Sequence, residues 1–81
     1  MADSLEDIEH LCGMAVGFPV ETYRVRSKPL FQVMPHATAV KGAVKEWWHD
    51  YLVSDQQFFD NPLQAAVRFA AAWNARKGDA Q

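Results

Sequence analysis

The sequence has little cysteine, no long apolar run and no glycine-rich motif, and each absence excludes a class of protein. Cys12 is its single cysteine, which allows no internal disulfide bond and no zinc site built from several cysteines. No apolar stretch approaches the roughly 18 residues that span a bilayer. The glycines form neither GxGxxG nor GxxxxGK[ST], the motifs that bind nucleotide phosphates. We therefore expect no membrane association, no bound metal and no cofactor.

The start of the chain also lacks a targeting signal. The stretch MADSLEDIEH is acidic and does not show the basic-then-apolar layout of a signal peptide. Together with the scarcity of cysteine, this predicts a cytoplasmic protein.

Apolar residues, by contrast, are plentiful. They make up 49% of the sequence and include three Trp and five Phe, which suits a packed core and argues against disorder. A length of 81 residues predicts a single domain over residues 1–81. We expect its ends, residues 1–3 and 79–81, to be frayed.

Turn signals and hydrophobic spacing predict a helix followed by a hairpin. Ser4 is the predicted N-cap of a helix over about 5–16, and Gly17 is its predicted left-handed C-terminal cap. Residues rich in β-branched and aromatic side chains then predict two strands, near 20–26 and 30–34.

Caps also predict two further helices. Thr38 would cap a helix that continues through about Val53. Asn61 and Pro62 would begin the last helix, which Gly78 would end. The predicted fold class is therefore α+β, in the order α-β-β-α-α, with a two-stranded antiparallel hairpin packed on the helices.

Apolar stripes at helical spacing predict which side chains of the terminal helices are buried. We expect the polar Asn74 to share the stripe of the last helix and to need a hydrogen-bond partner there. The stripes comprise Leu5, Ile8, Leu11, Cys12, Ala15 and Val16 in the first helix, and Leu63, Ala66, Val67, Phe69, Ala70 and Trp73 in the last.

The charges are arranged in blocks of one sign. Residues 1–23 contain five acids and no Lys or Arg, residues 24–45 contain five bases and no acid, and residues 46–60 contain four acids and no base. Such blocks either steer a charged partner toward the protein or satisfy one another across the fold.

The stretch VKEWWHDYL, residues 44–52, places two tryptophans side by side in the predicted second helix. At about 100° per residue, Trp47 lies in the middle of the apolar stripe and Trp48 on its flank. A tryptophan on such a flank either anchors a partner or covers the hairpin. The predicted partner-binding set combines Trp48 with the acidic block and an aromatic residue of the following loop: Glu46, Trp48, Asp50, Asp55, Phe58 and Asp60.

The residues that could support catalysis or metal binding are poorly placed for either. His49 and Asp50 are consecutive in a helix, so their side chains splay apart. His10 and Cys12 would point about 200° apart and could not easily share a metal ion. The segment around Cys12 is acidic, which gives its thiol no basic neighbour that would make it a nucleophile. We therefore expect no enzymatic activity.

Nucleic-acid binding is the alternative function. Arg24, Arg26 and Lys28 would align on one strand and its turn, where they could follow a phosphate backbone. The net charge of −2 and the shortness of this basic ridge argue against direct nucleic-acid binding as the main role. The same residues are otherwise an ordinary solvated strand face.

The run PLQAAVRFAAAWNARKG resembles the closing helix of Lar-type restriction alleviation proteins, which phages and prophages encode. The match consists of Ala72, Trp73, Asn74 and Arg76. That family also carries paired CxxC zinc knuckles, which this chain lacks, so the resemblance implies no metal site. It implies a small phage or mobile-element accessory protein that binds and blocks a host defence complex, as anti-restriction and anti-CRISPR proteins do.

These observations together predict a non-enzymatic protein-binding module. Its expected partner is a host protein or a protein–nucleic-acid complex in the host cytoplasm, blocked by steric and electrostatic contact. Either a monomer or a homodimer fits the sequence, since free hairpin edges could pair two copies.

Overall fold

The computed structural model describes residues 4–25, 27–54 and 57–79. It confirms the predicted α+β class and element order. The elements are α1 (Leu5–Val16), β1 (Val20–Arg24), β2 (Phe31–Pro35), the 3-10 turn η1 (Ala37–Ala39), α2 (Gly42–Ser54) and α3 (Pro62–Asp79). Most of the predicted frayed ends lie outside the described residues, but Asp79 belongs to α3.

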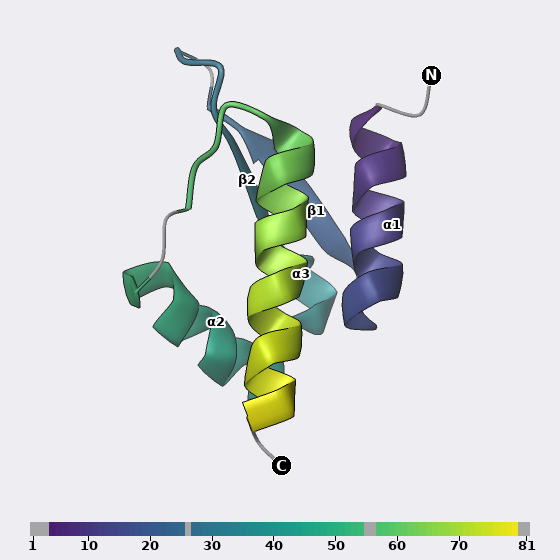
Figure 1. The fold of residues 1–81 in the computed structure, drawn as a ribbon, viewed down its shortest axis with the longest axis vertical. Coiled ribbons are helices and arrows are strands. Elements are labelled where there is room, and N and C mark those ends of the chain that lie inside the picture. Colours follow the sequence, from purple (N-terminus) through teal and green to yellow (C-terminus); the bar gives the residue numbers. More distant parts are fainter. Residues whose placement is uncertain (1–3, 26, 55–56, 80–81) are drawn as a thin grey trace.

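The last helix occupies the middle of the fold (Figure 1). α3 lies between α1 and α2, and α1 runs beside it in the same direction. The hairpin packs against this pair, with β1 next to α1 and β2 next to α3. The two strands are antiparallel, with Thr22 opposite Val33 at the centre of the register.

The predicted caps of α1 and the start of α3 are confirmed. The Ser4 hydroxyl accepts a hydrogen bond from the amide of Asp7 at 3.2 Å, and Gly17 ends α1 with a positive φ of 90°. The Asn61 side chain accepts hydrogen bonds from the amides of Leu63 and Gln64, at 2.8 and 3.3 Å. These bonds satisfy amides that have no partner within the first turn of a helix.

The predicted start of the second helix is wrong. His36 caps a separate 3-10 turn, and its Nδ1 accepts a hydrogen bond from the amide of Thr38 at 3.2 Å. α2 begins only at Gly42, which has a φ of 57°. A residue with a left-handed φ does not lie inside a right-handed helix, so Gly42 marks the start of α2.

The predicted end of the last helix and the length of the strands also differ. α3 continues through Gly78 to Asp79, so this glycine does not end the helix. The strands span 20–24 and 31–35, and the intervening turn is closed by a hydrogen bond from the Val25 amide to the Leu30 carbonyl at 2.9 Å.

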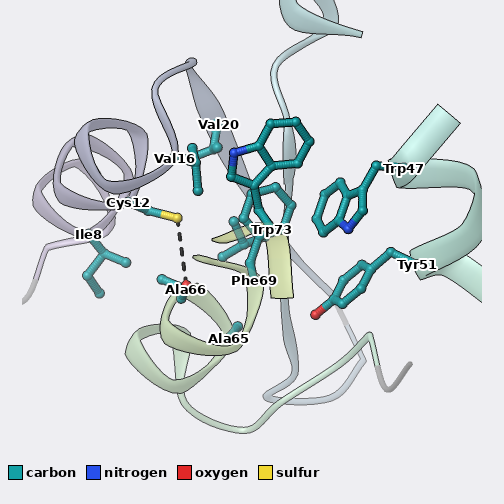
Figure 2. Close-up of a cluster of buried hydrophobic side chains, with 11 residues drawn as sticks. Ile8, Cys12, Val16, Val20, Trp47, Tyr51, Ala65, Ala66, Phe69 and Trp73 are labelled. Carbon is teal, nitrogen blue, oxygen red and sulfur yellow. Dashed lines mark hydrogen bonds between the residues drawn. The ribbon is translucent and has the colours of Figure 1, made fainter. Parts of the chain in front are cut away.

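One cluster of buried side chains joins the helices and the hairpin (Figure 2). Phe69 of α3 is its most buried member, with 1% of its surface exposed. Phe18 and Trp47 meet Phe69 edge to face, the geometry that aromatic rings favour. The buried members of the cluster are Ile8, Cys12, Val16, Val20, Val33, Trp47, Tyr51, Ala65, Ala66, Phe69 and Trp73.

Both outer edges of the hairpin are partly covered. The Glu9 carboxylate of α1 accepts a hydrogen bond from the Thr22 amide at 2.6 Å on the outer side of β1. On the outer side of β2, Phe31 and Phe59 exchange backbone hydrogen bonds at 2.7 and 2.9 Å. Pro35, further along that edge, has no amide hydrogen to offer. These features disfavour pairing of two copies through hairpin edges.

Candidate protein-binding surfaces

The inner side of α2 is fixed to the rest of the protein by aromatic contacts. Trp47 stacks on Tyr51 with ring centroids 5.0 Å apart, and it meets Trp73 edge to face at 5.2 Å. Trp48 is half-buried, and its ring centroid lies 5.8 Å from that of Phe69. Trp47 is therefore a core residue, as predicted, and Trp48 rests on the flank of the core with part of its surface open.

The outer side of α2 carries two residues of the predicted partner-binding set. Glu46 and Asp50 are one turn apart and both exposed. They border a shallow hollow together with Lys45 and His49. Lys45 belongs to the basic block of the sequence, but helical spacing places it beside these acids. The surface is therefore of mixed charge.

The remaining predicted residues follow α2. Asp55 lies outside the described residues. Phe58 and Asp60 are exposed and flank Phe59, which bridges to β2. The predicted set is thus divided between the outer side of α2 and the edge of the hairpin, and its role in binding stays a prediction.

The predicted basic ridge lies toward the tip of the hairpin. Arg24 is exposed, with its guanidinium carbon 5.9 Å from the centre of the Phe31 ring. Lys28 is exposed in the turn, and Arg26 lies outside the described residues. Nucleic-acid binding by this ridge stays a prediction.

A groove of mixed polarity separates α2 from α3. Trp47 and Tyr51 line it from α2, and Arg68 and Arg76 line it from α3. The Arg76 guanidinium lies over the Trp73 ring, 4.4 Å from its centre, a favourable cation–π geometry. Both arginines of α3 thus lie on the side that faces α2.

The opposite flank of α3 forms a predominantly apolar groove with α1, which we call the α1/α3 groove. Its volume is about 140 Å³. Large apolar side chains around it are exposed to solvent: Leu11 by 58%, Leu63 by 52% and Val67 by 61%. Met14, one turn from Leu11, is exposed by 69%. The lining residues are Ile8, Leu11, Cys12, Ala15, Leu63, Ala66, Val67 and Ala70.

Sequence reasoning missed this surface, because it assigned Leu11, Leu63 and Val67 to buried stripes. The apolar arc of α3 is too wide for its neighbours to cover, since the core side is already occupied by Ala65, Phe69 and other buried residues. The width of the arc was the available signal. A stripe much broader than about 100° on a surface helix exceeds what one packed face needs.

Two hydrogen bonds join the walls of the groove. The Cys12 thiol donates to the Ala66 carbonyl at a distance of 3.7 Å (Figure 2). The Asn74 amide donates to the Ala15 carbonyl at 3.4 Å. Asn74 is exposed rather than buried, but it has the backbone partner that its polarity required.

Burial raises the pKa of the Cys12 thiol to about 11, so the nucleophilic thiolate is rare near neutral pH. Within the described part of the chain, no group of three or more His, Cys, Asp or Glu side chains could hold a metal ion.

Among the described residues, no helix combines the length and the apolar character needed to cross a membrane. Comparison of the chain with protein-family models, curated proteins and solved structures gave no match.

Proposed function

We propose that the protein is a non-enzymatic protein-binding module that makes its main contact through the α1/α3 groove. The observation that carries the proposal is the exposure of Leu11, Leu63 and Val67 around one apolar hollow. Apolar side chains gathered in one exposed patch lower the free energy when a partner removes them from water. Exposed charged residues such as Glu46 and Asp50 need no such explanation, because most charged residues lie at the surface.

The rigidity of the groove supports the same function. Its two walls are helices that share the buried cluster, and the contact from Cys12 to Ala66 holds them together. Binding to preformed walls costs less conformational entropy than binding that must first order a loop of the protein. The buried thiol of Cys12 and the exposed, splayed His49 and Asp50 favour binding over catalysis.

For the partner, we propose a host defence protein or protein–nucleic-acid complex that this protein blocks by occupying it. The support is the resemblance of the last helix to restriction alleviation proteins. In this structure Trp73 belongs to the buried cluster and Asn74 bonds to α1. These two matched residues therefore hold α3 against the rest of the protein. The resemblance supports the class of protein and does not indicate the place of contact.

Affinity capture with surface variants tests the proposal. The tagged protein is incubated with a lysate of the host cells, and captured proteins are identified by mass spectrometry. We expect the double variant Leu11→Gln, Val67→Gln to lose the captured partner, because glutamine keeps the helix propensity but removes the apolar contact. Denaturant unfolding of each variant checks that the fold is retained.

Val53→Gln is the matched control. Val53 is an apolar residue of α2 with 85% of its surface exposed, and it does not line the groove. This variant should capture the partner as the unmodified protein does. Equal capture by the double variant and the control would show that the contact lies elsewhere.

A further inference from the structure

The α1/α3 groove also indicates what kind of segment would fill it, an inference that rests on the proposed function. Its walls are two helices whose backbone groups are bonded within each helix. They offer no free row of amides and carbonyls to which an extended strand could add. A segment buried here must satisfy its own backbone hydrogen bonds, and a helix does so.

The dimensions of the groove suit a short helix. The lining runs from Ile8 to Ala15 on α1 and from Leu63 to Ala70 on α3. Each wall is therefore about 10 Å long, at roughly 1.5 Å per residue. Two to three turns of helix, with apolar side chains at i, i+3 or i+4 and i+7, would cover that length.

The charges beside the groove decide which helix fits. Asp7 is exposed one turn before Leu11 on the same side of α1. Residues 1–23 contain no Lys or Arg, and the arginines of α3 line the opposite groove. On α3, Gln64 and Asn74 are the exposed polar residues next to Val67 on this flank, and both are uncharged. Among the residues whose side chains the structure describes, the charge beside the groove is therefore the negative one of Asp7.

A second copy of the chain would fit this border poorly. In a two-fold dimer the same surface meets itself, so both acidic α1 helices would enter one interface. Like charges placed together oppose association. From the apolar lining and the acidic border, we infer that the α1/α3 groove binds an amphipathic helix of another protein, with Lys or Arg beside its apolar stripe.

Synthetic peptides test this inference. The probe is a fluorescent amphipathic peptide of about four turns, with leucines at i, i+4, i+7 and i+11 and lysines beside them. Two controls replace every lysine by glutamate, or place a proline in the middle to break the helix. Fluorescence anisotropy measures binding at low and at physiological ionic strength.

The lysine peptide should bind the unmodified protein. Each control peptide should bind at least about tenfold more weakly, because one loses the charge attraction and the other loses the helix. The double variant Leu11→Gln, Val67→Gln should weaken binding of the lysine peptide by about tenfold or more. Asp7→Asn should weaken it by a few fold, mainly at low ionic strength, whereas Glu21→Gln on β1, an exposed acid outside the groove, should leave it unchanged.

Several results would overturn the inference. They are absence of binding, equal binding of the lysine and glutamate peptides, equal binding of the proline peptide, and binding that the double variant does not change. Self-association of the unmodified protein in sedimentation, lost in the double variant, would identify a second copy as the occupant. Loss of lysate capture in the double variant without peptide binding would retain the proposed function and reject the helical, basic occupant.

Discussion

A buried hydroxyl without a partner is a local weakness of the hairpin. The Thr22 Oγ1 atom is buried and forms no hydrogen bond within the described residues. Thr22→Val keeps the shape of the side chain and removes this unsatisfied group. We expect the free energy of unfolding to rise by about 1 kcal/mol, measured by urea denaturation.

Thr38 provides the comparison for this substitution. Its hydroxyl is exposed and lies 2.8 Å from the Nδ1 atom of His36. Thr38→Val removes a satisfied group and should not stabilise the protein. A Thr22→Val variant that is no more stable than the unmodified protein would mean that the buried hydroxyl has a partner after all.

The buried thiol of Cys12 predicts a loss of stability at alkaline pH. Burial raises its pKa from 9.0 to about 11 in the folded state, so the unfolded chain releases this proton at lower pH than the folded one. The contribution to stability is therefore constant below pH 9.0 and declines as the pH rises toward about 11.

Denaturation curves across that pH range measure the effect. The unmodified protein should lose more stability between pH 9.0 and about 11 than Cys12→Ala does. Comparing the two slopes removes the contribution of lysines and tyrosines, which both proteins share. Equal slopes would contradict a raised pKa for this thiol.

Single residues with a local role were predicted well from the sequence. Ser4 and Asn61 cap their helices because a side-chain oxygen reaches an amide two or three residues ahead, which sequence spacing alone determines. The exposure of Leu11 and Val67 could not be predicted in this way. Whether an apolar side chain is covered depends on which element packs beside it.

Among the elements, α1 and β1 are linked by one polar contact with a testable role. The Glu9 carboxylate accepts the hydrogen bond of the Thr22 amide on the outer edge of β1. Glu9→Ala should lower the free energy of unfolding by about 1–2 kcal/mol, because it leaves this amide without its acceptor. Hydrogen exchange of the Thr22 amide should become faster.

Glu6→Ala is the control for the same helix. Glu6 is exposed and borders the same hollow as Glu9, so its removal should change neither stability nor exchange at Thr22 by much. Glu9→Gln should fall between the two, because the amide oxygen can still accept. Unchanged exchange in Glu9→Ala would show that the carboxylate does not protect the edge.

The boundaries of α2 and α3 show why elements are harder to predict than caps. Gly42 would lie inside the helix predicted from Thr38 to about Val53, but its positive φ places it at the start of α2. Gly78 was expected to end α3, yet the helix continues through it. Glycine permits both conformations, so its presence alone does not determine which one the chain adopts.

At the scale of the whole molecule, two surfaces compete as the contact site, and charge reversal separates them. The variant Glu46→Lys, Asp50→Lys, Asp60→Lys changes the three acids of the predicted partner-binding set that lie among the described residues, all of them exposed. For the partner recovered by capture, we expect association to slow by about tenfold and dissociation to change little, since exposed charges act mainly on encounter. Surface plasmon resonance measures both rates.

Glu21→Lys is the control, because Glu21 is an exposed acid of β1 outside that set. It should slow association much less than the triple variant. Much faster dissociation of the triple variant would make the outer side of α2 a direct contact. Unchanged association would leave the acidic block without a part in binding.

The sequence predicted the α+β class and the order of elements because local patterns determine each helix and strand. It did not predict which helix lies in the centre. α3 takes that place because Phe69 and Trp73 meet rings from both Phe18 and Trp47. Such contacts join residues far apart in the chain, and no local pattern records them.

The central position of α3 has a consequence for synthesis of the chain on the ribosome. Residues 4–54 emerge first, and they include Phe18 and Trp47, whose rings pack against Trp73 of α3 in the folded protein. Until residues 62–79 have followed, these aromatic surfaces remain uncovered and open to chaperones or to aggregation. The nascent protein therefore cannot complete its core step by step, and its folding must wait for the last helix.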